Sequence, residues 1–144
     1  MGSVIVHAVP EGFAEVVARP GFTCHIGGVY MNAERGALGA LIRREHLNPA
    51  HIAHGGFLAT LADSSFGVAF QKHLDVAVPP LTVTLNIDYI GAVREGEWVE
   101  ARVEIHKVGR TLAYASTCLQ VGERIALRAN GVFILNQGRP PVTS

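Results

Sequence analysis

The stretch that decides the fold is LNPAHIAHGGFLATLADSSFGVAF, which runs from Leu47 to Phe70. Large apolar residues recur in it every three or four positions, the spacing of one face of an α-helix. The pattern predicts one long helix from about His54 to His73. Its apolar stripe comprises Phe57, Leu58, Leu61, Ala62, Phe66, Ala69 and Phe70. The single carboxylate of this helix, Asp63, lies at the margin of the stripe, where it is either an ordinary surface residue or a functional acid.

Two glycines, Gly55 and Gly56, stand at the start of this helix directly after His54. A glycine inside a helix costs about 1 kcal/mol relative to alanine, so the pair needs an explanation. The first turn of a helix carries free N–H groups and the positive end of the helix dipole, and without side chains a ligand oxygen can reach them. The pattern fits an oxyanion-binding turn, and it also fits a glycine-rich loop that simply ends there.

After the helix the pattern changes to a period of two. In LTVTLNIDYI, residues 81–90, alternation predicts a half-buried strand with Leu81, Val83, Leu85, Ile87 and Tyr89 on one face. The same alternation places Thr82, Thr84, Asn86 and Asp88 on the other face. Three more strands are expected within 98–108, 111–121 and 123–136, joined by short turns that favour antiparallel pairing.

Before the helix, residues 21–32 and 37–47 are expected to form two strands, and residues 11–18 a short helix that Pro20 stops. The pair Gly27-Gly28 indicates a bulge or a close backbone approach. The expected fold class is therefore α+β, one domain over residues 1–144 with six antiparallel strands and one long helix. Residues 1–20 are taken as an N-terminal extension and 137–144 as a loose tail.

Composition limits the classes of function. The 144 residues are 49% hydrophobic and carry no formal net charge, which disfavours a nucleic-acid or anionic-membrane partner. No apolar run is long enough to span a membrane, and the N-terminus lacks the features of a signal peptide, so a cytoplasmic location is expected. Cys24 and Cys118 are expected to be small buried residues rather than a disulfide or a nucleophile.

No metal site is expected, because His46, His51 and His54 lack carboxylate or cysteine ligands at matching spacing. A GxSxG elbow, a CxxC pair, a P-loop and a GxGxxG fingerprint are all absent from the sequence.

The opening stretch resembles the signature of the hotdog-fold acyl-CoA thioesterases, in the group of phenylacetyl-CoA thioesterase and thioesterase superfamily member 2. Asn48, the run His54-Gly55-Gly56 and Asp63 match that signature position by position. The segments LTVTLNIDYIGAVREGE and HKVGRTLAYAS are also similar, so the resemblance covers roughly residues 22–135. Two positions depart from the family pattern, since His51 stands where glycine is usual and Thr82 where serine is usual.

The resemblance implies a six-stranded sheet wrapped around the helix, and a homodimer or homotetramer with active sites between subunits. It implies that the Gly55 N–H polarises the thioester carbonyl and that Asp63 of the other subunit acts as general base or nucleophile. Asn48 would hold the attacking water or the loop, His54 would position the turn, and Thr82 would assist Asp63.

The same resemblance places coenzyme A at Gly56 and at the turn formed by Lys107, Gly109, Arg110 and Thr111, whose two cations suit phosphates. No cofactor is implied, because coenzyme A is part of the substrate. The expected function is hydrolysis of an acyl- or arylacyl-CoA thioester. The alternatives are a hotdog protein that binds or senses acyl-CoA without hydrolysing it, a hotdog hydratase or dehydratase, and a purely structural role.

Overall fold

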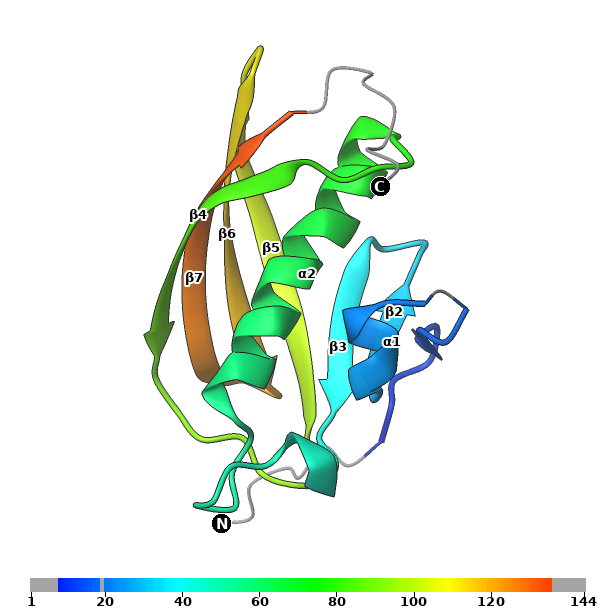
Figure 1. The fold of residues 1–144 in the computed structure, drawn as a ribbon, viewed down its shortest axis with the longest axis vertical. Helices are drawn as coiled ribbons and strands as arrows, with labels where there is room; N and C mark the ends of the chain where they lie inside the picture. The colour runs from blue at the N-terminus through cyan, green and yellow to red at the C-terminus, as the bar shows by residue number, and fades with distance from the viewer. Residues whose placement is uncertain (1–7, 19, 136–144) are drawn as a thin grey trace.

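A single antiparallel sheet curves around one long helix in the computed structural model, which describes residues 8–18 and 20–135 (Figure 1). The strands follow the order β1-β2-β3-β5-β6-β7-β4 across the sheet. They are β1 (Ala14–Glu15), β2 (Val29–Asn32), β3 (Ala37–Leu41), β4 (Leu81–Tyr89), β5 (Trp98–Val108), β6 (Leu112–Val121) and β7 (Arg124–Ile134). The helices are α1 (Phe22–Ile26), the 3₁₀ turn η1 (Arg44–His46) and α2 (Gly55–Leu74). The predicted α+β fold is confirmed, with the two-residue β1 as a seventh strand.

Three predictions for the N-terminal part are wrong. The strand expected over residues 37–47 ends at Leu41, and residues 44–46 form η1 instead. Residues 11–18 form no helix, because Ala14 and Glu15 pair with β2 and so satisfy their backbone groups in the sheet. Residues 22–26 form α1 instead of a strand. Gly27 and Gly28 follow it, both at φ +74°, and their left-handed conformation delays the start of β2 to Val29. The predicted tail, residues 137–144, lies outside the described residues.

The apolar stripe of α2 packs against the sheet as the sequence predicts. Phe57, Leu58, Leu61, Ala62, Phe66 and Phe70 are buried. The rings of Phe66 and Phe70 lie 4.8 Å and 5.1 Å from the ring of Phe133 on β7. Burial of each such side chain stabilises the fold by about 1.5–3 kcal/mol. No described helix is long and apolar enough to cross a membrane.

His46 joins η1 to both α2 and the glycine pair. Its ring is 3% exposed and stacks on Phe57, with centroids 4.1 Å apart. His46 Nδ1 accepts from the Arg43 N–H at 2.9 Å, so Nε2 carries the proton and donates to the Gly27 carbonyl at 2.9 Å. A Cβ on Gly28 would lie 2.5 Å from His46 Cε1, which confirms the close backbone approach expected at the glycine pair.

Burial lowers the pKa of His46 below its ordinary value of 6.5, and nearby Arg43 acts in the same direction. The unfolded chain therefore binds this proton more readily than the folded chain, and stability is lost as the pH falls below about 6.5. We expect the melting temperature to drop from pH 7.5 to pH 5.5. In His46→Phe, which keeps a ring on Phe57, the drop should be smaller even though the variant is less stable at pH 7.5.

The matched control is His25→Asn, which removes an exposed ring from α1. It should retain the wild-type pH dependence in the same thermal melts. Equal pH dependence in wild type and His46→Phe would contradict the assignment to His46.

Candidate active site

Asp63 is fixed on the side of α2 that faces away from the core. The Thr82 hydroxyl on β4 donates to Asp63 Oδ1 at 2.7 Å, and the carboxylate is half-buried. Asp63 Oδ2 accepts no hydrogen bond from the residues that the structure describes. The carboxylate is thus held by one oxygen and open at the other, unlike a freely solvated surface aspartate.

The face predicted for Thr82 is wrong, and a β-bulge is the reason. Register with β7 shifts between Thr82 and Thr84, which leaves Val83 as the extra residue. Thr82 is paired with Phe133, whose ring contacts α2, so Thr82 shares the helix-facing side with Leu85 and Ile87. Bulges re-aim a side chain in this way. Without the bulge, simple alternation would turn the hydroxyl away from Asp63.

The His54-Gly55-Gly56 turn forms the start of α2. His54 is the N-cap, and its Nδ1 accepts from the Gly56 N–H at 2.8 Å. The His54 carbonyl accepts from the N–H groups of Phe57 and Leu58. Among the described residues nothing accepts from the Gly55 N–H, which leaves it as the unpaired donor of this first turn.

Tyr89, at the end of β4, was not predicted as a site residue. Its hydroxyl donates to the Gly55 carbonyl at 2.7 Å. A Cβ on Gly55 would lie 3.3 Å from the ring, so Tyr89 covers this glycine closely. The sequence pattern placed Tyr89 on the face with Leu85 and Ile87, and that side is the one that reaches α2.

Asn48 holds the loop before α2. Asn48 Oδ1 accepts from the N–H groups of Ala50 and Ile52, at 2.9 Å and 3.3 Å. Between them His51 adopts φ +62°, a left-handed conformation that glycine takes without strain. The loop therefore keeps the conformation that glycine favours at this position even though histidine occupies it.

One chain does not bring its own Gly55 and Asp63 together. They are eight residues apart on one straight helix, which corresponds to about 12 Å along the axis. Groups that act on the same carbonyl must each lie about 3 Å from the reacting atoms. One chain contains both halves of the predicted site, the Gly55 turn and the Asp63 carboxylate, but holds them too far apart to act on the same carbonyl.

The predicted coenzyme A residues lie at the turn between β5 and β6. The Gly109 N–H donates to the Leu112 carbonyl at 2.8 Å, and Lys107, Arg110 and Thr111 are exposed. This turn lies at the end of the molecule where α2 finishes, opposite the end where Gly55 starts the helix (Figure 1). The two predicted subsites are therefore distant within one chain.

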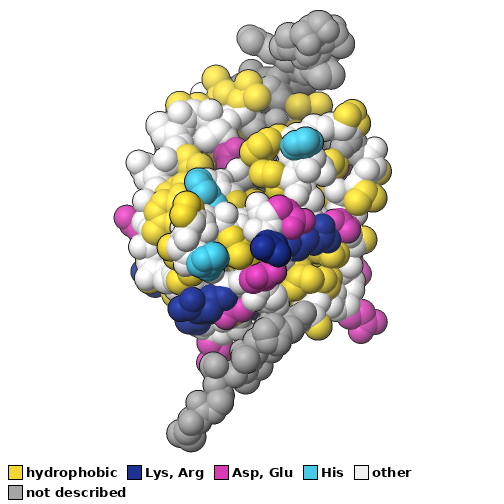
Figure 2. Space-filling model, turned by 60° about the horizontal axis from the view of Figure 1, so that its bottom comes forward, with side chains coloured by type: hydrophobic (Ala, Val, Ile, Leu, Met, Phe, Trp, Pro, Cys, Tyr) yellow, Lys and Arg dark blue, Asp and Glu magenta, His cyan; other side chains and the backbone are white. Residues whose placement is uncertain are grey.

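The end of the molecule that carries the start of α2 presents a mixed surface. Figure 2 shows basic and acidic side chains side by side there, with histidines among hydrophobic groups and no large field of one sign. Within residues 8–18 and 20–135 no three histidine, cysteine or carboxylate side chains are grouped to hold a metal ion.

Comparison with known proteins agrees with this geometry. The thioesterase superfamily matches residues 50–124, which include the turn at Gly55 and Asp63. The chain belongs to the thioesterase superfamily. A candidate esterase of Pseudomonas aeruginosa is 37% identical over 130 residues, covering 88% of this chain and 97% of that protein.

Mouse acyl-coenzyme A thioesterase 13 is 35% identical over 78 residues, which span 54% of this chain and 55% of that protein. The crystal structure of zebrafish thioesterase superfamily member 2 superposes with a TM-score of 0.65, at 24% identity, over 87% of this chain and 82% of the other. The fold is thus the hotdog fold, and the activity that the family assigns is thioester hydrolysis.

The role of the Gly55 N–H can be tested without removing the turn. Proline suits the first position of a helix and lacks an N–H, and His54 already has the extended conformation, φ −61° and ψ 134°, that proline requires before it. We expect Gly55→Pro to lower kcat for thioester hydrolysis about 10²–10³-fold relative to Gly55→Ala.

Gly55→Ala is the matched control, because it places the same Cβ against Tyr89 but retains the N–H. Circular dichroism of both variants verifies that α2 still forms. Equal kcat values for the two folded variants would show that the Gly55 N–H does not take part.

Proposed function

We propose that this protein hydrolyses an acyl-CoA thioester to a free acid and coenzyme A, in sites shared between two copies of the chain. The observation that carries the proposal is the pair of half-sites on α2. One half-site is a fixed carboxylate, Asp63 bonded to Thr82 at 2.7 Å, and the other is the N–H of Gly55, which has no acceptor within residues 8–18 and 20–135. Since about 12 Å of helix separates them, Asp63 of one copy works with Gly55 of the other.

The edge strand β4 supports association of two copies. It is the last strand of the sheet, and no other described strand pairs with its outer edge. Leu81 and Val83 on it are 61% and 55% exposed. An unpaired apolar edge is a template for pairing with another strand, and a two-fold axis there would turn the second α2 antiparallel to the first. We propose a homodimer, alone or paired into a homotetramer.

In this site the thioester carbonyl oxygen accepts a hydrogen bond from the Gly55 N–H of one copy. Asp63 of the other copy takes a proton from a water molecule, and the water oxygen attacks the carbonyl carbon. The carbon–sulfur bond then breaks, and the proton passes to the departing sulfur. Direct attack by Asp63, with hydrolysis of the resulting anhydride, gives the same products. Thr82 orients the carboxylate in either case.

The remaining residues serve binding and position. Asn48 and His54 hold the loop and the first turn of α2, so that the Gly55 N–H stays aimed at the carbonyl. Gly56 carries no side chain beside that turn; a Cβ there would come within 3.0 Å of His54 Nδ1, so glycine lets the His54 ring cap the turn. Lys107 and Arg110, with Gly109 and Thr111 in the same turn, provide positive charge for the coenzyme A phosphates.

The role of Asp63 as general base or nucleophile is tested by the variant Asp63→Asn. It keeps the size of the side chain and the bond from Thr82 but removes proton acceptance at neutral pH. We expect kcat for acyl-CoA hydrolysis, followed by release of free thiol, to fall about 10²–10⁴-fold. Thr82→Val should lower kcat roughly tenfold through loss of one hydrogen bond to a charged group, and Thr82→Ser should recover most of it.

The control is Asp88→Asn, an exposed carboxylate on the outer side of β4. It should turn over substrate like wild type. If Asp63→Asn does so too, Asp63 is neither the general base nor the nucleophile. If wild type binds acyl-CoA and releases no thiol, the non-catalytic binding protein becomes the better interpretation.

A further inference from the structure

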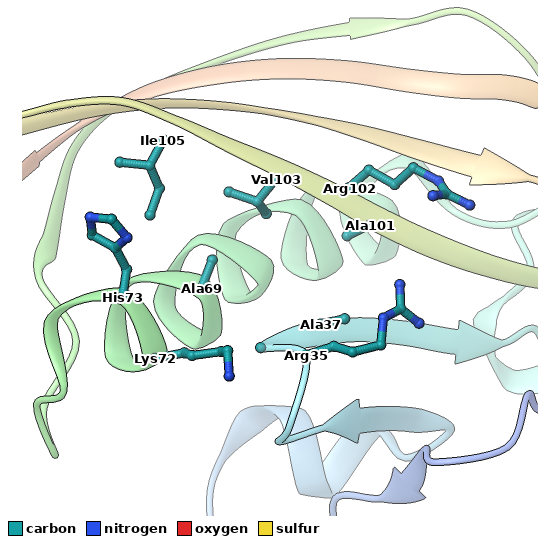
Figure 3. Close-up of a pocket in the computed structure, with 10 residues that line it drawn as sticks. Arg35, Ala37, Ala69, Lys72, His73, Ala101, Arg102, Val103 and Ile105 are labelled. Carbon is teal, nitrogen blue, oxygen red and sulfur yellow. The ribbon is translucent and has the colours of Figure 1, made fainter.

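A hollow of about 380 Å³ lies between the last part of α2, the start of β3 and the middle of β5 (Figure 3). It is present because β5 is longer than the strand beside it. β3 pairs only with residues 98–100 of β5, and from Ala101 onward no described strand pairs with β5 on that side. An open strand edge presents backbone N–H and C=O groups, so the hollow can bind polar groups through its backbone alone.

The side chains around the hollow are of two kinds, apolar and basic. The apolar ones are Ala37, Ala69, Ala101, Val103 and Ile105, and the basic ones are Arg35, Lys72, His73 and Arg102. No carboxylate is among the described residues that line it. The whole chain carries 12 Lys and Arg against 12 Asp and Glu, so this hollow is a local excess of positive charge in a chain without net charge.

Arg102 on β5 brings a charge that no acid balances. It has neither a hydrogen bond nor an ion pair within residues 8–18 and 20–135. The two acids that neighbour it on β5 contact other groups. Glu100 binds Arg35 at 2.9 Å, and Glu104 lies 3.9 Å from His106. The planar guanidinium of Arg102 is therefore available for an anion, and its fork of donors suits a carboxylate.

Lys72 is held at the edge of the hollow by neutral groups. Its stem lies against Gly36, where a Cβ would come within 2.7 Å of Lys72 Cδ, and its ammonium donates to the Glu34 carbonyl. A carbonyl leaves the positive charge of the ammonium unbalanced. Next to it His73 has no bonded partner in the described part of the chain, and Figure 3 shows its ring extending from α2 toward β5.

We propose that this hollow binds a small organic anion with an apolar body, of the class of medium-chain carboxylates. The charged head would lie among the basic side chains and the body against Val103 and Ile105, which are partly buried. An inorganic anion would leave the apolar wall uncovered, and a neutral chain would leave the cations without a partner. Only a ligand with both parts satisfies both kinds of lining.

The hollow is separate from the proposed catalytic site, and the inference does not rest on the proposed function. Neither Asp63 nor Gly55 lines it, and neither does the turn with Lys107 and Arg110. Its volume is near the lower end of the range of about 300–1,000 Å³ for small-molecule sites, which suits a ligand of the size of a short fatty acid.

The test is a titration with octanoate followed by the backbone amide NMR signals, which report affinity and location together. In the wild type the largest shifts should fall on Ala69, Val103 and Ile105. Octanamide has the same body without the charge, and acetate has the charge without the body. Both should bind at least about fivefold more weakly than octanoate.

Two variants change the two kinds of lining separately. Arg102→Gln removes one unbalanced charge and should raise the Kd for octanoate about fivefold. Ala69→Phe fills the hollow from α2 and should abolish the shifts at Val103 and Ile105. The matched control is Arg128→Gln, which removes the same charge from an exposed position on β7 outside the hollow and should retain the wild-type Kd.

Four results would overturn the assignment. The first is the absence of any shift at millimolar octanoate. The second is a set of shifts centred on Gly55 and Asp63, which would place the acid in the proposed catalytic site. The third is equal affinity for octanamide, and the fourth is an unchanged Kd in Arg102→Gln.

Discussion

Burial of the apolar stripe of α2 against the sheet fixes the rotation of that helix about its axis. Because Leu58, Ala62 and Phe66 must face the centre of the sheet, Asp63 is turned toward the edge strand β4, where the Thr82 hydroxyl holds it. The same rotation directs Ser64 and Val68 toward the N-terminal segment, on another side of the helix. One packing interaction therefore sets the direction in which the candidate site residue Asp63 points.

The start of α2 depends on a second, smaller set of contacts. The buried ring of His46 stacks on Phe57 and is bonded to the backbone of Arg43 and Gly27. The His54 N–H donates to the His46 carbonyl at 2.8 Å, so η1 leads directly into the cap of α2. In this way the core anchors the turn whose Gly55 N–H has no acceptor among the described residues.

The sequence predicted the long helix and the four strands after it, because each rests on local periodicity. The parts that it missed depend on contacts between distant segments. The short α1 and β1 follow from glycine conformations and from pairing with β2. The bulge at Val83 reverses Thr82, and Tyr89 reaches Gly55 only once β4 lies beside α2.

The most direct test of a site shared between two copies is subunit complementation. Asp63→Asn and Gly55→Pro chains, each nearly inactive alone, are co-expressed with different tags, and the mixed dimer is purified through both tags. One of its two sites then combines an intact Asp63 with an intact Gly55, so the account predicts about half the wild-type activity per dimer. A mixed dimer no more active than either parent would contradict the account.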